Sequence, residues 1–311
     1  MGTYRLGTRN SALARYQTQW VREKLEGQGV SVEIVESESL GDKDLLTALY
    51  EMELESPGIF TKHLESQLVA GTIDLAVHSL KDLPTTQPAG LKVACIPVRE
   101  TGGECLFIRK DVLDASRPLG LPTGATVGTS SLRREALFLS VRPDLNVVPI
   151  RGNIPTRLKA VVERKITALV LAGAGVSRLG LGHSEVECLM LPEDVFVCAP
   201  GQGALAVEVR SDDEGTKRLA SRIDHHDSRL ATTAERAFHA SLGGGCQLPL
   251  GALATVKGEA LRLEGVLLDP DGKKRIRLVT EGPKEKAQEI GAQLGKTLKK
   301  EGAEELLHVS R

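Results

Sequence analysis

Apolar and polar residues alternate along the chain in two patterns. Short runs of Val, Ile, Leu and Ala, such as residues 73–79 and 166–172, are typical of buried strands. Residues 11–28 instead place Leu13 and Trp20 on one side at the spacing of an amphipathic helix. The two patterns alternate through most of the chain. Strands that alternate with helices predict parallel sheets in an α/β architecture.

The pattern predicts the limits of most regular elements. The expected strands are residues 3–8, 31–39, 73–79, 91–98, 104–109, 125–130, 145–150, 166–172, 204–210, 251–257, 260–268 and 273–280. The expected helices are residues 11–28, 60–71, 131–141, 154–164, a short one ending near residue 180, and residues 214–223, 230–242 and 284–302.

Three domains follow from this order of elements. The simplest arrangement places the strand at 204–210 in the first sheet. The residues between the two parts of that sheet then form a second domain inserted into the first. The helix, three strands and closing helix after residue 224 form a small α+β unit. We therefore expect a discontinuous domain 1 of residues 1–101 and 200–221, an inserted domain 2 of residues 104–197, and a domain 3 of residues 224–311.

Composition is that of a globular protein. The chain has 311 residues, of which 41% are hydrophobic and 26% charged. It contains no apolar stretch long enough to span a bilayer, and its first residues lack the apolar core of a signal peptide, so we expect no membrane association and a cytoplasmic location.

Five cysteines occur without CxxC or Cys/His ligand spacing, which argues against a disulfide framework and a zinc site, and we expect no metal. Cys95, Cys105, Cys188 and Cys198 lie in strand-like apolar runs and are expected in the core. Cys246 differs, because three glycines precede it in the loop "SLGGGCQLPLG". It is either an inert thiol in a tight turn or a thiol that a ligand must reach.

The net charge is −1, so the chain has no general attraction to nucleic acid, and an aromatic content of 3% offers little for base stacking. Residues 130–179 nevertheless carry nine basic and three acidic residues, a local excess of +6. A solvated helix face would explain some of these charges. A particular anionic ligand explains more, because the arginines recur where a strand ends and a helix begins.

Polar side chains gather at several of these strand ends, where open α/β sheets bind ligands. Ser79, Lys81 and Asp82 follow the strand at 73–79, and a carboxylate there can stabilise a positive charge or move a proton. Guanidinium groups suit carboxylates, and several separate arginine sites suit a ligand with many of them. The other polar residues at strand ends are Arg9, Ser11, Thr129, Ser130, Ser131, Arg133, Arg134, Arg151, Arg157 and Arg178.

Eight stretches, in order and correctly spaced, resemble the porphobilinogen deaminase (hydroxymethylbilane synthase) family of tetrapyrrole (haem) biosynthesis. They cover nearly the whole chain: "GTRNSALA", "DLAVHSLKDLP", "VGTSSLRR", "RGNIPTRL", "LAGAGVSRLG", "PGQGALAVEVR", "HH…TAERAF" and "GGGCQLPLG".

The resemblance implies a fold and a reaction. The fold is two domains like those of type II periplasmic binding proteins around a cleft, plus a small C-terminal α+β domain. The reaction is a transferase reaction, in which four porphobilinogen molecules condense head to tail on a covalent dipyrromethane cofactor with loss of ammonia, and water then releases linear hydroxymethylbilane. The resemblance also implies a monomer that passes its product to the next enzyme of the pathway.

Residue roles follow from the same resemblance. Cys246 would carry the cofactor through a thioether, and Asp82 would be the catalytic carboxylate. The residues implied to bind the cofactor are Lys81, Thr129, Ser131, Arg133, Arg134, Arg157 and the backbone near Gly173. Those implied to bind substrate are Arg9, Ser11, Gln17, Arg151 and Arg178. Ser79 and Gln202 are second-rank candidates.

One segment departs from the family. Residues 50–60 carry Glu51, Glu53 and Glu55 where a glycine- and lysine-rich lid over the cleft is usual, so no lid contact is carried over. A solute-binding protein that holds an anion in the same two-domain cleft is the alternative reading, although it leaves the third domain and its cysteine unexplained.

Overall fold

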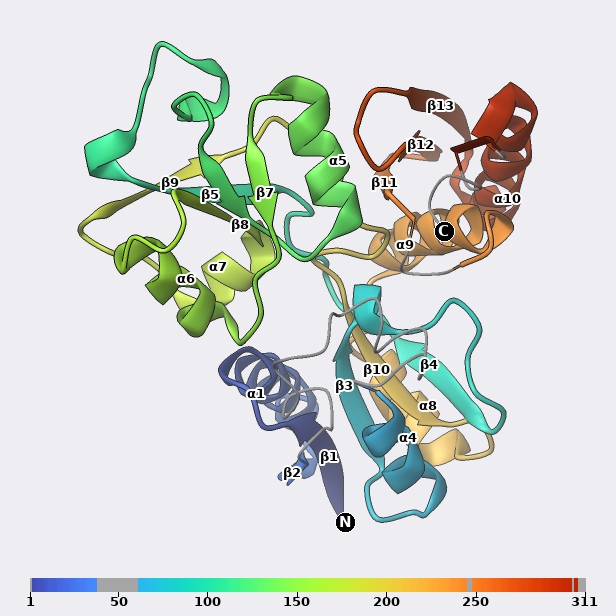
Figure 1. Ribbon diagram of the computed structural model, residues 1–311. Helices are drawn as coiled ribbons and strands as arrows, with labels where there is room; N and C mark the ends of the chain where they lie inside the picture. Colours follow the sequence, from blue (N-terminus) through green and yellow to red (C-terminus); the bar gives the residue numbers. More distant parts are fainter. Residues whose placement is uncertain (1, 38–60, 245–247, 304, 307–311) are drawn as a thin grey trace.

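The computed structural model describes residues 2–37, 61–244, 248–303 and 305–306, which form three units, each built on one sheet (Figure 1). The acidic segment at 50–57 and Cys246 lie outside the described residues.

The first unit is a five-stranded sheet with helices. Its elements are β1 (Thr3–Arg9), α1 (Ala12–Glu26), β2 (Ser31–Ser37), α4 (Lys62–Val69), β3 (Leu75–Ser79), the short 3-10 turn η1 (Leu80–Asp82), β4 (Leu91–Cys95), β10 (Leu205–Arg210) and α8 (Glu214–Ser221). The strand order is β2-β1-β3-β10-β4, so β10 returns to the sheet of the N-terminal strands. Leu6, Leu75 and Val207 lie at the centre of its core.

The second unit repeats this plan. Its elements are β5 (Glu104–Arg109), η2 (Lys110–Val112), η3 (Pro118–Gly120), β6 (Thr126–Gly128), α5 (Leu132–Val141), β7 (Asn146–Val148), α6 (Ile154–Val162), β8 (Ala168–Ala172), α7 (Gly173–Leu179) and β9 (Val186–Met190). The strand order is β7-β6-β8-β5-β9.

Neither sheet is purely parallel, and the expectation of parallel sheets is wrong in this respect. In the first sheet, β10 runs antiparallel to β3 and β4, and in the second, β5 runs antiparallel to β8 and β9. These two strands are the ones that enter their sheet directly from the other unit. They therefore start at the edge where the remaining strands end, which forces the opposite direction.

Two chain segments, residues 96–103 and 198–204, join the units and touch one another. The Glu100 amide donates to the Gly203 carbonyl at 3.4 Å. Gly203 has φ +86°, and a Cβ there would lie 2.5 Å from the Glu100 carbonyl oxygen, so the close approach requires glycine.

The third unit is an antiparallel sheet with two long helices. Its elements are α9 (His226–Ser241), β11 (Leu250–Lys257), β12 (Ala260–Leu268), β13 (Arg275–Pro283), η4 (Lys284–Lys286), α10 (Ala287–Leu298) and η5 (Lys299–Ala303). The unit packs on the second one, because Val266 and Leu268 of β12 share a core cluster with Phe138 of α5.

The architecture agrees with the predicted fold class in its two α/β units, each on a five-stranded sheet, and its small C-terminal α+β unit. The domain limits given above stay a prediction. Cys188 corrects one expectation: it is exposed because β9 is the edge strand of its sheet, whereas Cys95, Cys105 and Cys198 are buried. Within the described ranges, no helix combines the length and apolar character that a membrane span needs.

Candidate active site

Asp82 lies on the short turn η1 that directly follows β3. The Leu80 amide donates to the Ala204 carbonyl at 3.0 Å, and the Leu83 amide closes the turn on the Leu80 carbonyl at 3.2 Å. Asp82 itself is exposed. The carboxylate therefore stands at the solvent end of a buried strand, on a turn whose backbone is fixed.

The neighbours of Asp82 in the first unit form two polar links. Lys81 Nζ donates to Gln202 Oε1 at 3.3 Å, and Nε2 of the same Gln202 side chain donates to the Gly102 carbonyl at 2.7 Å. Gln17 of α1 is buried and donates to Ser79 Oγ at 3.0 Å. These links attach the end of β3 to α1 and to both joining segments.

Cations of the second unit interact electrostatically with the residues of this turn. Burial lowers the pKa of Lys81 to about 8, and the positive charge of Arg134 adds to the effect. Burial likewise lowers the pKa of Arg157 to about 10, together with repulsion from Arg134 and Arg151, while Asp82 opposes the shift. The strand ends of the two units therefore form one electrostatic site, with Asp82 in it.

Glu104, the first residue of β5, forms ion pairs with Arg133 and Arg134 of α5. Its side chain is fully buried and accepts from Arg133 Nη2 at 2.6 Å and from Arg134 Nη2 at 2.7 Å. Burial alone would raise the pKa of Glu104, but the charges of Arg134 and Arg133 prevail and lower it to about 2. Glu104 is therefore ionised at neutral pH.

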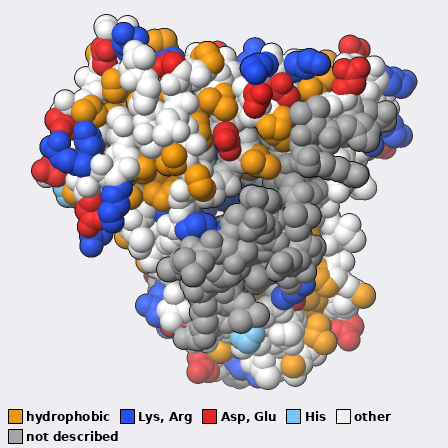
Figure 2. All heavy atoms as spheres, viewed as in Figure 1, with side chains coloured by type: hydrophobic (Ala, Val, Ile, Leu, Met, Phe, Trp, Pro, Cys, Tyr) orange, Lys and Arg blue, Asp and Glu red, His pale blue; other side chains and the backbone are white. Residues whose placement is uncertain are grey.

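Positive charge exceeds negative charge among the described residues of this cluster. Lys81, Arg133, Arg134 and Arg157 are linked electrostatically to two carboxylates, Asp82 and Glu104. Figure 2 shows Lys and Arg side chains in a hollow near the middle of the molecule. An anionic ligand would complete the charge balance here.

Three further predicted cofactor residues lie at helix starts of the second unit. Ser131 is the N-cap of α5 and accepts from the Arg134 amide, and Thr129 Oγ1 accepts from the Ser131 amide at 3.2 Å. Gly173 begins α7, and a Cβ there would lie 3.2 Å from the Gly103 carbonyl oxygen. Capping and close backbone contact explain these residue types structurally, and their role in binding stays a prediction.

The predicted substrate residues fall into two groups. Ser11 caps α1 by accepting from the Ala14 amide, and Arg178 is buried, donating to Glu100 Oε1 at 2.9 Å and to the Gly203 carbonyl at 2.8 Å. Both therefore have structural partners. Arg9 ends β1 and Arg151 follows β7, as expected, whereas Gln17 lies within α1, buried and bonded to Ser79.

Sequence reasoning missed the buried carboxylates that organise this region. Besides Glu104, the fully buried Glu235 of α9 accepts from Arg99 Nη1 at 2.6 Å and from the Gly201 amide at 2.7 Å, so it ties both joining segments to the third unit. The available signal was a glutamate at the start of the apolar run "ECLFIR", and another inside the alanine-rich helix.

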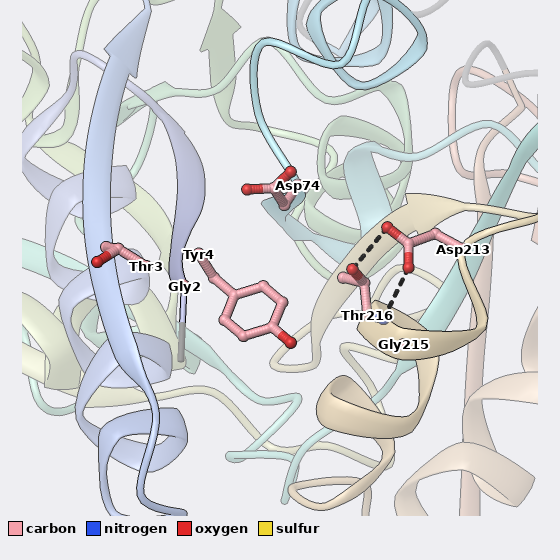
Figure 3. Close-up of a pocket in the computed structure, with 7 residues that line it drawn as sticks. All are labelled: Gly2, Thr3, Tyr4, Asp74, Asp213, Gly215 and Thr216. Atoms are coloured by element: carbon pink, nitrogen blue, oxygen red, sulfur yellow. Dashed lines mark hydrogen bonds between the residues drawn. The ribbon is translucent and has the colours of Figure 1, made fainter.

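A separate hollow lies at the far side of the first unit (Figure 3). It has a volume of about 310 Å³ and is lined by Tyr4, Asp74, Asp213 and Thr216, among others. Asp213 accepts from the Thr216 amide and hydroxyl, as the cap of α8. The hollow contains none of the candidate residues, so we assign it no part in the site.

Known proteins resemble this chain over its full length. Residues 4–218 match the family model described as porphobilinogen deaminase, dipyromethane cofactor binding domain, and residues 229–300 match that of the porphobilinogen deaminase C-terminal domain. The porphobilinogen deaminase of Pelotomaculum thermopropionicum is 46% identical over 98% of this chain and 96% of its own length. That of Carboxydothermus hydrogenoformans is 43% identical, with the same two coverages.

Solved structures show a more distant likeness. The methionine-binding protein MetQ is 12% identical with a TM-score of 0.44, covering 78% of this chain and 94% of that one. The VFT2 domain of BvgS from Bordetella pertussis is 14% identical with a TM-score of 0.41, covering 71% and 86%. On the two family models and the full-length relatives, the chain belongs to the porphobilinogen deaminase family.

Proposed function

We propose that this chain is the transferase that joins four porphobilinogen molecules head to tail and releases linear hydroxymethylbilane after addition of water. The observation that carries the proposal is the exposed Asp82 carboxylate, which interacts electrostatically with one desolvated cation of each unit, Lys81 of the first and Arg157 of the second. Porphobilinogen carries an acetate, a propionate and an aminomethyl group, and this site offers partners for the two carboxylates and a carboxylate for the reacting ring.

Asp82 would act on the charge that develops during each addition. The bond between the aminomethyl carbon and its nitrogen breaks and ammonia leaves, so positive charge spreads over the pyrrole ring of the substrate. A carboxylate that accepts a hydrogen bond from the ring N–H stabilises this charge. A carbon–carbon bond then forms to the free α-carbon of the growing chain, which loses its ring proton, and Asp82 is the proposed carrier of that proton.

The residues present fit the dipyrromethane cofactor of the family model. When bound, this group supplies the free α-carbon to which the first substrate is joined. The lowered pKa values of Lys81 and Arg157 mark desolvated cations that an anionic group would relieve. Arg133 and Arg134 both donate to the Glu104 carboxylate. Lys81 donates instead to the Gln202 side chain and Arg157 Nε to the Gly152 carbonyl, so their charges are the less compensated and they are the stronger candidates for direct contact.

The remaining assignments complete the proposal. Cys246 would hold the cofactor through its sulfur, and Thr129, Ser131 and the backbone at Gly173 would assist the cations. Arg9 and Arg151 would meet the substrate carboxylates, whereas Ser11, Gln17 and Arg178 would act through the structural contacts described above.

Mass analysis tests this function. Purified protein is expected to carry an adduct the size of two pyrroles, which Cys246→Ser abolishes, and porphobilinogen should add further units while ammonia is released. Asp82→Ala should keep the fold and the adduct but nearly eliminate ammonia release. An unmodified protein that binds porphobilinogen without releasing ammonia would refute the proposal and favour a solute-binding protein. We also propose a cytoplasmic monomer that passes its product to the next enzyme, and sedimentation analysis checks the oligomeric state.

A further inference from the structure

Arg236 of α9 binds the loop that directly follows Asp82. Its Nη1 donates to the Leu83 carbonyl at 3.1 Å, and its Nη2 donates to the carbonyls of Pro84 at 2.5 Å and Thr85 at 3.3 Å. Burial lowers the pKa of Arg236. A single guanidinium therefore holds three successive carbonyls, although it sits in an environment that disfavours its charge.

These bonds complete a clamp on the turn that carries Asp82. The Leu80 amide fixes the start of the turn to the Ala204 carbonyl, and the Leu83 amide closes it on Leu80. Arg236 fixes the end of the turn through the carbonyl of the same Leu83. Without Arg236, the start of the turn stays anchored to the first unit, but the end loses these three hydrogen bonds to the third unit.

A second contact joins the same two segments. The Gly244 amide donates to the His239 carbonyl at 3.1 Å, so Gly244 continues from the end of α9. A Cβ on Gly244, whose φ is +68°, would lie 2.5 Å from Thr85 Oγ1. The loop after Asp82 and Gly244 therefore lie against one another, and α9 supports both.

We propose that Arg236 is a positioning residue for Asp82. It fixes the end of the Asp82 turn against α9. The Asp82 carboxylate thereby stays aligned with the growing pyrrole chain, which Cys246 would hold. The proposal rests on the function proposed above. It predicts that loss of Arg236 reduces the rate of the chemical step more than it weakens substrate binding, because the substrate carboxylates meet other residues.

Arg229 offers a matched control on the same helix. It too donates from α9 to a backbone carbonyl, that of Ala94 at 2.7 Å, and it pairs with Asp224 at 2.6 Å. Its bonds stabilise the contact between the first and third units but do not touch the loop after Asp82. Arg229→Met should therefore lower stability without affecting catalysis.

The experiment compares Arg236→Met, Arg236→Lys and Arg229→Met with the unaltered protein. Intact mass first gives the fraction of each protein that carries the adduct, so that kcat refers to loaded enzyme. For Arg236→Met we expect kcat to fall about tenfold or more with KM within about twofold, which is a loss confined to the transition state. Hydrogen exchange of residues 80–87 should accelerate about tenfold. Arg236→Lys should restore part of both, whereas Arg229→Met should change neither.

An unchanged exchange rate at residues 80–87, or an unchanged kcat in Arg236→Met, overturns the proposal. A matching loss of kcat in Arg229→Met overturns it too, because the effect would then be one of stability. If Arg236→Met does not fold, kcat, KM and the exchange rate of Arg236→Lys test the proposal instead. Failure of the unaltered protein to release ammonia would instead refute the proposed function, and the exchange data would still report whether Arg236 fixes the turn.

Discussion

Replacement of Glu104 by Gln is the change whose effect the structure defines most closely. Gln keeps the size of the side chain but removes the charge that balances Arg133 and Arg134, which lie at 2.6 and 2.7 Å from its carboxylate oxygens. Two guanidinium groups would then remain buried with no carboxylate between them. Breaking such a buried pair by removing one partner is strongly destabilising.

The magnitude follows from the pKa of Glu104. Its lowering from 4.5 to about 2 corresponds to about 3 kcal/mol in favour of the ionised form in the folded protein. This stabilisation is fully present above pH 4.5, the unfolded value, and is lost as the pH falls through 4.5 toward 2. Glu104→Gln should therefore lower the free energy of unfolding by about 3 kcal/mol at pH 7, and by much less at pH 3.

Urea unfolding of both proteins between pH 3 and pH 7 measures this difference. Glu100→Gln is the control, because Glu100 also pairs with an arginine, Arg178 at 2.9 Å, but its side chain is 41% exposed. An exposed carboxylate of this kind contributes about 1 kcal/mol or less. Equal stability of Glu104→Gln and the unaltered protein at pH 7, or a difference that does not shrink toward pH 3, would refute the reasoning.

Three further predictions use the same structure. Burial lowers the pKa of Lys81 from 10.5 to about 8, so the free energy of unfolding should rise with pH between 8 and 10.5. KM for porphobilinogen should rise above pH 8, because Lys81 then loses its charge. Lys81→Met should flatten both pH dependences, which unfolding and steady-state assays measure. Iodoacetamide should label Cys188 before the other three described cysteines in the native protein, because it is exposed and a hydrogen bond from Cys105 lowers its pKa, and peptide mapping checks this order. Gly244→Ala should reduce both stability and the yield of adduct, because φ is +68° and the new methyl group meets Thr85. Gly258→Ala is the control: it has similar backbone strain (φ +60°) in open space and should reduce stability alone. Intact mass and thermal unfolding measure the two effects.

The regular elements and most of the strand-end residues could be predicted from the sequence. Strands and helices alternate with clear periodicity, and the polar residues that follow β3, β6 and β7 stand out against apolar runs. Helix α9 begins at His226, four residues before the predicted start, because His225 caps it by accepting from the Ser228 amide. Local pattern alone does not show that a ring nitrogen takes this role.

The partners of the arginines could not be predicted. Arg133 and Arg134 at a helix start suggest a ligand, because cations oppose the helix dipole there. The structure gives them Glu104, about thirty residues earlier in the chain, on a strand whose other side chains are mostly apolar. Arg178 meets Glu100 and Glu235 meets Arg99 in the same way, across a long sequence separation. Such pairings depend on which segments the fold brings together, and periodicity carries no information about them.

The contrast between Glu104 and Asp82 shows how the fold assigns different tasks to two carboxylates in one electrostatic cluster. Glu104 is fully buried, its oxygens accept from two guanidinium groups, and its pKa of about 2 leaves it no proton to exchange. It can therefore hold cations in place but cannot meet a substrate. Asp82 is exposed, on a turn fixed at Leu80 and Leu83, so its carboxylate is accessible to a ligand, as the proposed reaction requires. Burial, rather than residue type, decides which carboxylate organises the site and which one is available to react.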